Sequence, residues 1–90
     1  IFYNIFMYYI YILENKNDKS WYTGYSSNLR HRIRDHLLGR GCKTTSKKSG
    51  WRLIYYEAYL IKKDATKREV FLKSGSGKRF IKKQLFNYLN

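Results

Sequence analysis

The stretch "SWYTGYSSNLRHRIRDH", residues 20–36, contains the pattern from which the fold of this chain can be predicted. Its first residues, "SWYTG", are aromatic and β-branched, which favours a short strand that ends at Gly24. A helix is predicted after it, over about residues 28–38. Three arginines and both histidines of the chain fall between residues 30 and 36. A strand, a glycine and a short basic helix therefore follow one another directly.

The predicted helix has one apolar stripe. Leu29, Ile33 and Leu37 recur every fourth residue, so we expect all three to be buried. Ser26 or Ser27 can accept a hydrogen bond from the first turn and cap the helix. The stripe predicts that this helix packs against the rest of the fold along one side.

The residues before this stretch predict a partner strand. "MYYIYIL", residues 7–13, is rich in aromatic and β-branched residues, and the polar residues 14–19 predict a turn. The two strands are expected to form an antiparallel hairpin, on which alternate residues share a face. These residues are Tyr9, Tyr11 and Leu13 on the first strand, and Tyr22 and Gly24 on the second.

The second half of the chain predicts one further strand and two helices. Gly39 is expected to end the first helix, and the basic residues 39–50 to form a flexible loop. Asp64 is expected to cap the helix that follows the third strand. The remaining elements are a strand over residues 51–60, a helix over about 65–73, a turn over 74–77 and a last helix over 78–89.

This order of elements predicts an α+β fold, with a small three-stranded antiparallel sheet flanked by helices. A chain of 90 residues leaves room for one domain, which we expect over residues 7–90. Residues 1–6 are expected to be an extension that precedes Met7.

The charge of the chain points to a polyanionic partner. The formal net charge is +13, while 43% of the residues are hydrophobic and 19% are aromatic, as in a globular domain. DNA is the leading candidate and RNA an alternative, because Lys and Arg bind nucleic acids through their phosphates. A membrane surface and a merely soluble basic protein are the other interpretations.

Cys42 is the only cysteine, so the chain cannot form an intrachain disulfide or a cysteine-based metal site. A single free cysteine fits a reducing compartment, and we expect the cytoplasm, with an organelle or a nucleoid as alternatives. The apolar residues 1–13 are fewer than the roughly 20 that a membrane-spanning helix needs. They also lack the basic start of a signal peptide, so no membrane association is expected.

Arg32 and His36 lie four residues apart, so both are expected on one side of the helix, beside the apolar stripe. An arginine at this position can meet the tyrosines of the sheet. For Arg32, this inward position and a solvated face both stay open. Arg30 and Arg34 form a more outward pair, for which a solvated face in contact with phosphates is expected.

Glu69 is one of only six acidic residues, and its spacing from Ala65 and Leu72 places it toward the core side of its helix. A surface ion pair would explain it. In a protein that binds phosphates, one inward carboxylate can alternatively hold Mg²⁺, together with water and phosphate oxygens. Glu57 and Glu14 are expected to make structural pairs.

Four blocks of the chain, in order, resemble the GIY-YIG nuclease superfamily. "YIY", residues 9–11, and "YTG", residues 22–24, resemble its paired tripeptides, and "YTGYSSNLRHRIRDH" resembles its first helix motif. "WRLIYYE" and "ATKREVFLKSGSGKRF" resemble its third strand and its A-x-x-R-E-x-x-x-K helix. The resemblance covers residues 7 to about 81, and is strongest to small members related to the nuclease domain of the excinuclease C subunit. The departures are Tyr9 for the first glycine, Thr23 for isoleucine, and Tyr25 where some members carry a lysine.

The resemblance implies a single site on the sheet face. Its catalytic residues are Tyr11, Tyr22, Arg32, His36 and Glu69, and Glu69 is also the metal-binding residue. Tyr22, with Tyr11, would orient water and take its proton. Arg32 would offset charge on the phosphate, and His36 would hydrogen-bond a tyrosine or relay a proton. Because a free phenol has a pKa of about 10, the resemblance also implies that Arg32 and the metal lower the pKa of a tyrosine.

The implied activity is that of a DNA endonuclease that depends on Mg²⁺ or Mn²⁺ and acts in DNA repair, recombination or a mobile element. Basic side chains are expected to grip the DNA backbone, with little sequence preference. These residues are Arg30, Arg34, Arg40, Lys43, Lys47, Lys48, Lys78 and Arg79. The alternative is a catalytically silent module that binds DNA or RNA through the same basic face. Whether a second chain supplies targeting stays open.

Overall fold

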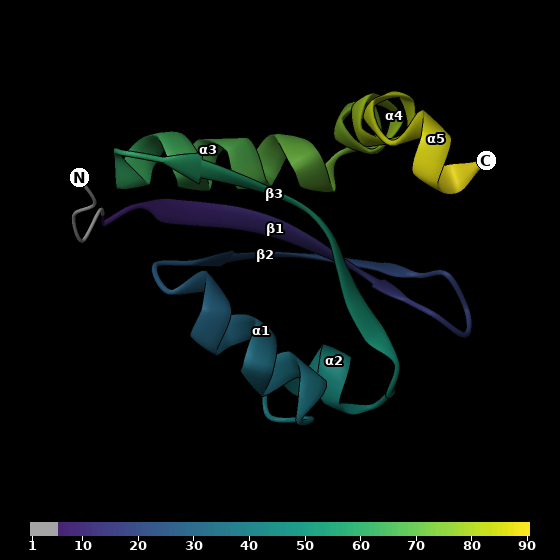
Figure 1. Ribbon diagram of the computed structural model, residues 1–90. Coiled ribbons are helices and arrows are strands. Elements are labelled where there is room, and N and C mark those ends of the chain that lie inside the picture. The colour runs from purple at the N-terminus through teal and green to yellow at the C-terminus, as the bar shows by residue number, and fades with distance from the viewer. Residues whose placement is uncertain (1–5) are drawn as a thin grey trace, which may run out of the picture.

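The computed structural model describes residues 6–90, so residues 1–5 of the predicted extension lie outside the described part (Figure 1). The fold is α+β, which confirms the predicted class. The strands are β1 (Tyr8–Asn15), β2 (Trp21–Ser26) and β3 (Trp51–Tyr59). The helices are α1 (Leu29–Leu37), α2 (Lys43–Ser46), α3 (Lys62–Lys73), α4 (Gly75–Gln84) and α5 (Phe86–Leu89).

The sheet has the order β2-β1-β3, and both neighbouring pairs are antiparallel, as predicted. β1 is the central strand, and its residues 10–13 each expose at most 1% of their surface. Opposite Tyr11 lie Gly24 on β2 and Tyr56 on β3. The register between β1 and β3 shifts between Ile12 and Leu13.

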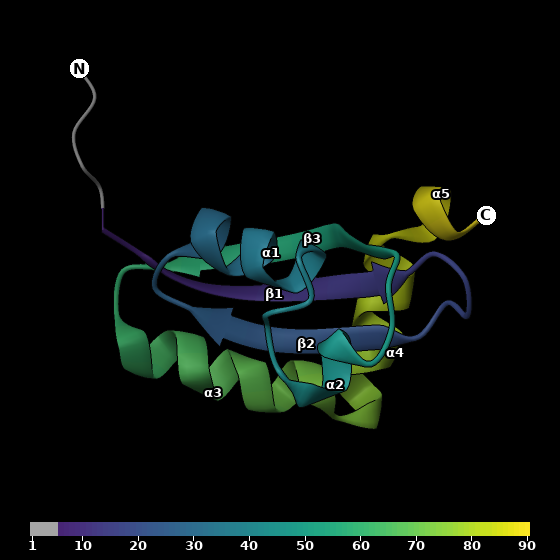
Figure 2. The same cartoon turned by 90° about the horizontal axis from the view of Figure 1, so that it is seen from below.

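Helices cover both faces of the sheet (Figure 1), and the alternation of side chains along β1 gives each face its own core. Ile10 and Ile12 point toward α3 and α4, where they pack with Ala65, Leu72 and Ile81. On the other face, toward α1 and α2, lie Tyr11, Leu13 and Trp51, packed with Tyr22, Leu29, Ile33 and Leu53. α3 runs alongside β2, one of the two edge strands (Figure 2).

The predicted apolar stripe of α1 is wrong at its last member. Leu37 is 60% exposed, whereas its neighbour His36 is only 2% exposed. With 3.6 residues per turn, a residue seven positions after Leu29 returns to within about 20° of it, and a residue eight positions after has turned about 80° away. His36 therefore occupies the inward position that the four-residue spacing assigned to Leu37.

Two helix starts also differ from the prediction. Asn28, rather than Ser26 or Ser27, caps α1, and its side-chain oxygen accepts a hydrogen bond from the His31 amide at 3.2 Å. α3 begins one turn earlier than predicted, so Asp64 lies inside its first turn and does not cap it. A carboxylate in that turn still interacts favourably with the helix dipole.

The loop and the last helix were predicted too simply. Residues 39–50 include the short helix α2. The predicted turn at residues 74–77 belongs to α4, where the Ser74 hydroxyl accepts a hydrogen bond from the Gly77 amide at 3.1 Å. A Cβ on Gly77 would overlap the backbone of Phe71 and Leu72, so glycine is required for α4 to pack closely on α3.

The structural pair expected for Glu57 is present. Glu57 on β3 accepts two hydrogen bonds from the guanidinium of Arg68 on α3, at 2.9 and 3.1 Å. This ion pair ties α3 to the far edge of the sheet. Within residues 6–90, no helix combines the length and the apolar character that crossing a bilayer requires.

Candidate active site

Tyr11 lies at the centre of the face that α1 covers, and Gly24 makes room for its ring. The two residues are direct partners in the β1–β2 ladder. A Cβ on Gly24 would overlap the hydroxyl and the ring of Tyr11, so no other residue fits without a shift of the strands. The glycine of "YTG" is thus a packing requirement of the buried tyrosine.

Tyr22 lies two residues before Gly24, on the same face, and is the diagonal neighbour of Tyr11. The two ring centroids are 6.4 Å apart, with the ring planes tilted by 41°. Tyr11 is fully buried, while Tyr22 is half-buried. Of the two phenols, Tyr22 is the one with a surface that a substrate can reach.

α1 delivers His36 to the same place. Its Nε2 lies 2.8 Å from the Tyr11 hydroxyl, and its ring centroid lies 5.3 Å from that of Tyr22. Its other nitrogen, Nδ1, lies 2.8 Å from the hydroxyl oxygen of Thr45. A Cβ on Gly41 would overlap the imidazole, so this second glycine also makes room for an aromatic ring of the site.

Thr45, on α2, is a site residue that the sequence analysis missed. It is completely buried, and its Oγ1 lies 3.5 Å from the sulfur of Cys42. Cys42, Thr45, His36 and Tyr11 therefore form one continuous hydrogen-bonded chain. The basic sequence around Thr45 contains no pattern that would have distinguished it from a solvated loop.

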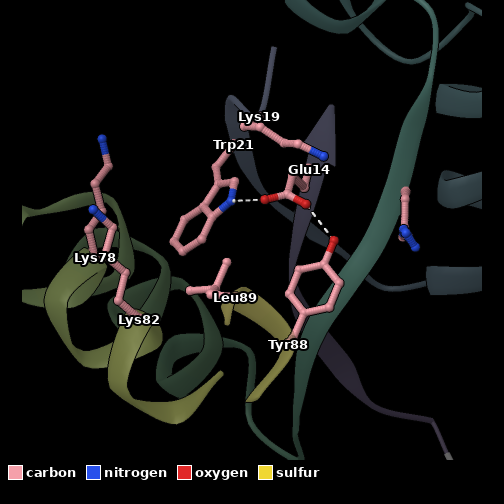
Figure 3. A pocket seen from close by; sticks show the side chains of 8 residues that line it. Glu14, Lys19, Trp21, Lys78, Lys82, Tyr88 and Leu89 are labelled. Carbon is pink, nitrogen blue, oxygen red and sulfur yellow. Dashed lines mark hydrogen bonds between the residues drawn. The ribbon is translucent and has the colours of Figure 1, made fainter. Parts of the chain in front are cut away.

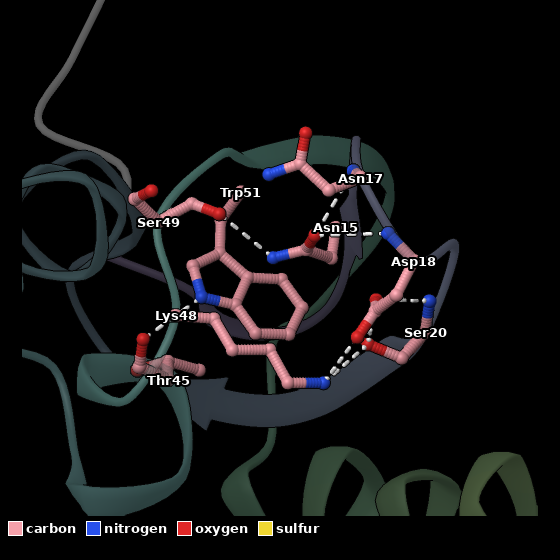
Figure 4. Close-up of polar contacts among 8 residues, drawn as sticks. All are labelled: Asn15, Asn17, Asp18, Ser20, Thr45, Lys48, Ser49 and Trp51. Atoms are coloured by element: carbon pink, nitrogen blue, oxygen red, sulfur yellow. Dashed lines mark hydrogen bonds and ion pairs between the residues drawn. The ribbon is translucent and has the colours of Figure 1, made fainter.

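Contacts with β3 and with the β1–β2 turn hold the α2 segment in place (Figure 4). The indole nitrogen of Trp51 donates a hydrogen bond to the Thr45 carbonyl at 2.9 Å. Lys48, just after α2, pairs with Asp18 of the turn at 2.5 Å. These contacts fix the backbone of Thr45, and through it the orientation of the His36 ring.

The pKa shifts of these residues indicate which group donates in each hydrogen bond of the network. Burial, reinforced by the charge of Arg32, lowers the pKa of His36, so its imidazole is neutral at neutral pH. Burial alone would raise the pKa of the Cys42 thiol, but hydrogen bonds with the Thr45 hydroxyl and backbone, and then with Tyr22, lower it to about 7. The arrangement that satisfies every group has Tyr11 donating to Nε2 of His36, and Nδ1 donating to Thr45.

The protein alone does not lower the pKa of either tyrosine, contrary to what the family resemblance led us to expect of Arg32. Burial raises the pKa of Tyr11, even though the adjacent Arg32 guanidinium acts in the opposite direction. Burial, followed by the neighbouring Cys42 thiol, also raises the pKa of Tyr22. Both phenols are therefore protonated at neutral pH in the protein on its own.

Arg32 and Glu69 belong to helices on the two faces of the sheet, and both influence Tyr11 electrostatically. Arg32 is half-buried, and its guanidinium interacts with the Tyr11 hydroxyl, which raises the pKa of the arginine. Glu69 lies on α3, which packs on the opposite face of the sheet and contacts β2. Its side chain is 22% exposed and pairs with Lys73 at 3.0 Å. The charge of Glu69 contributes to the raised pKa of Tyr11, so its carboxylate acts on the tyrosine site electrostatically.

The donors near the tyrosines suit a hard divalent cation. Among residues 6–90, no three His, Cys, Asp or Glu side chains cluster as ligands, so a closed zinc-type centre has no counterpart in this part of the chain. Mg²⁺ needs only one or two protein carboxylates, with water and phosphate oxygens completing its shell. Glu69 is a single, partly exposed carboxylate whose charge acts on Tyr11, so it fits that requirement.

A sequence profile of the GIY-YIG catalytic domain matches residues 7–84. The chain belongs to the GIY-YIG family. Its resemblance to this family, drawn above from four sequence blocks, is confirmed. Membership implies a nuclease domain, which hydrolyses nucleic acid.

Relatives of this GIY-YIG domain are small proteins of similar length. The chain is 42% identical over 67 residues to UPF0213 protein CPE1444 of Clostridium perfringens, which covers 74% of this chain and 71% of that protein. It is 33% identical over 78 residues to UPF0213 protein YazA of Bacillus subtilis, covering 87% and 75%. The solution structure of UPF0213 protein BH0048 from Bacillus halodurans is similar, with a TM-score of 0.53 and 38% identity, and covers 91% of this chain and 84% of that one.

The basic residues predicted to bind nucleic acid fall on two sides of this GIY-YIG domain (Figure 1). Arg30, Arg34, Arg40, Lys43, Lys47 and Lys48 belong to α1, α2 and their loops, on the face of the tyrosines. Lys78 and Arg79 belong to α4, on the opposite face. The first group therefore shares a face with the tyrosines, and the second group does not.

Proposed function

We propose that this chain is an endonuclease that hydrolyses phosphodiester bonds in DNA with the help of Mg²⁺ or Mn²⁺. The buried hydrogen bond between Tyr11 and His36 carries this proposal. It fixes a neutral histidine and a phenol in the interior, directly beside a second, half-exposed phenol and an arginine. Such a set of aligned donors and acceptors suits proton transfer at a phosphate better than it suits simple binding.

Tyr22 is the phenol in a position to contact solvent, so it would orient the attacking water and take its proton. Tyr11 has no exposed surface. It acts as a positioning residue, which holds Arg32 on one side and His36 on the other. The hydrogen-bonded chain through Thr45 keeps His36 in the tautomer that accepts from Tyr11.

Arg32 would stabilise the negative charge that develops on the phosphate during hydrolysis. Glu69 would hold the cation. When bound there, Mg²⁺ supplies positive charge that polarises the phosphate and favours ionisation of a nearby phenol. This supply of charge is needed because burial disfavours the ionised form of both tyrosines.

Supercoiled plasmid incubated with Mg²⁺, with EDTA as the control, tests the proposal. Wild type should nick or linearise the plasmid only in the presence of the ion. Glu69→Gln should abolish cleavage while the fold is retained, since the amide keeps the shape of the side chain and loses its charge. Asp64→Asn, which removes an exposed carboxylate from the same helix, is the matched control and should cleave as wild type does.

A catalytically silent module that binds DNA or RNA is the second candidate. The Glu69–Lys73 ion pair favours it, because a paired carboxylate is a weaker cation ligand. This candidate requires DNA binding without any cleavage by wild type in Mg²⁺ or Mn²⁺. A single-stranded RNA substrate assayed in parallel separates a DNA nuclease from an RNA nuclease.

A further inference from the structure

A polar pocket lies on the sheet face opposite to the tyrosines, between the strands and the α4–α5 end of the chain (Figure 3). Its volume of about 610 Å³ falls within the range of about 300–1,000 Å³ that is typical of small-molecule sites. The lining residues are Glu14, Lys19, Trp21, Arg52, Lys78, Lys82, Tyr88 and Leu89.

One row of the sheet forms the floor of this pocket. Trp21 on β2 and Arg52 on β3 are the direct partners of Glu14 on β1. Side chains at directly paired positions point to the same face of a sheet. Trp21 packs against the core beneath α3 and α4, so the whole row faces away from Tyr11 and Tyr22.

Glu14 organises the aromatic walls. It is only 6% exposed, and its carboxylate accepts hydrogen bonds from the indole nitrogen of Trp21, at 3.1 Å, and from the hydroxyl of Tyr88 (Figure 3). The guanidinium of Arg52 lies 5.6 Å from the centroid of the Tyr88 ring. Two aromatic side chains are therefore held at fixed positions beside the cavity.

The positive charges around the pocket are not neutralised within the described part of the chain. Lys19, Arg52, Lys78 and Lys82 make no ion pair among residues 6–90, and Glu14 lies beyond ion-pair distance of all four. Lys19 also adopts a φ of 64°, a left-handed conformation that glycine or asparagine takes at lower cost.

We propose that this pocket binds a nucleotide, with the base against Trp21 and Tyr88 and the phosphate among the lysines. Inorganic phosphate alone would leave the aromatic surface unused, while an uncharged apolar ligand would leave the cations unpaired. A planar base joined to a phosphate satisfies both parts. The nucleotide can be a free mononucleotide or the end of a nucleic acid strand. The proposal does not depend on cleavage at the tyrosine site, which lies on the other face of the sheet.

Each face of the sheet has one tryptophan, whose indole NMR signal can report binding on that face. Trp21 borders the pocket and Trp51 lies in the core beneath α1, and these are the only two indoles of the chain. In a ¹⁵N–¹H spectrum, titration with AMP in EDTA should shift the indole peak of Trp21 and leave that of Trp51 in place. A shift of both peaks alike, or of neither, would overturn the proposal.

Four probes define the ligand chemistry. AMP should bind more tightly than adenosine, which lacks the phosphate, and than inorganic phosphate, which lacks the base. If either fragment binds as well as AMP, half of the proposed site is unused and the proposal fails. A short 5′-phosphorylated single-stranded oligonucleotide is the fourth probe. Tighter binding of this strand than of AMP assigns the pocket to a strand end, and weaker binding assigns it to a free nucleotide.

Two double variants distinguish binding at the pocket from non-specific attraction to the positive charge of the protein. Lys78→Ala with Lys82→Ala should weaken AMP binding about tenfold or more, since the variant removes two ammonium groups that would donate charge-assisted hydrogen bonds to the phosphate. Lys62→Ala with Lys63→Ala removes the same charge from exposed positions at the far end of α3 and should change binding less than about twofold. Equal losses in the two double variants would mean non-specific attraction and would sink the proposal.

Discussion

Nε2 of His36 lies 2.8 Å from the hydroxyl of Tyr11, and this bond joins α1 to the central strand inside the protein. Both side chains are buried, at 2% and 0% exposure. The imidazole has to be neutral to accept the phenolic proton. The fold and the candidate site therefore both depend on the protonation state of one histidine.

The stability of the protein is expected to fall as the pH is lowered below about 6.5, the ordinary pKa of histidine. Burial lowers the pKa of His36 in the folded protein. As the pH falls, His36 therefore binds a proton in the unfolded chain first, which stabilises the unfolded state relative to the folded one. The loss continues until the pH reaches the lowered pKa. Urea unfolding at about pH 7.5 and about pH 5.5 measures it.

His36→Gln should reduce this pH dependence, since the variant has no proton to take up at that position. His31→Gln is the matched control, because His31 is an exposed residue on the same helix. It should keep the wild-type dependence. An unchanged dependence in His36→Gln would show that other groups cause it.

Thr45 is expected to position His36. Thr45→Val keeps the size of the side chain but removes the hydroxyl, which leaves Nδ1 of His36 without its partner inside the protein. An unpaired buried polar group costs about 1–3 kcal/mol, and cleavage should fall as well. Thr45→Ser keeps the hydroxyl and loses one methyl group, so it should retain most of the cleavage. The prediction fails if the valine and serine variants cleave at the same rate.

Gly24 is expected to tolerate no side chain. In Gly24→Ala the new methyl group overlaps Tyr11, and overpacking of this kind costs about 1–3 kcal/mol. Gly75→Ala is the control, because a Cβ there meets only the flexible end of Arg79, at 3.5 Å, and alanine favours a helix. Chemical unfolding of both variants checks this. Equal stability of the two would mean that the strands shift to make room.

Local patterns allowed the three strands, their antiparallel pairing and the α+β class to be predicted from the sequence. Local patterns failed where contacts with residues distant in the sequence determine whether a side chain is buried. Thr45 is buried because α2 folds back over His36 and Trp51, and nothing in the basic segment around it indicates this. Leu37 was expected to be buried because the four-residue spacing ignores the remaining rotation of the helix. Only the fold shows that Lys78 and Arg79 lie on α4, on the sheet face opposite to the tyrosines.

Arg32 and Arg34 should separate chemistry from DNA binding. Arg32 is half-buried beside Tyr11, whereas Arg34 is exposed on the same helix. In the proposed mechanism, Arg32→Ala removes a donor to the reacting phosphate and should lower the turnover rate about 10²-fold or more. Arg34→Ala should mainly weaken DNA binding and reduce the slope of log K against log [salt] by about 1. Cleavage rates at saturating DNA and binding at several salt concentrations distinguish the two effects. If both variants lose binding alike and keep the same turnover rate, Arg32 belongs to the DNA-binding surface and has no part in the chemistry.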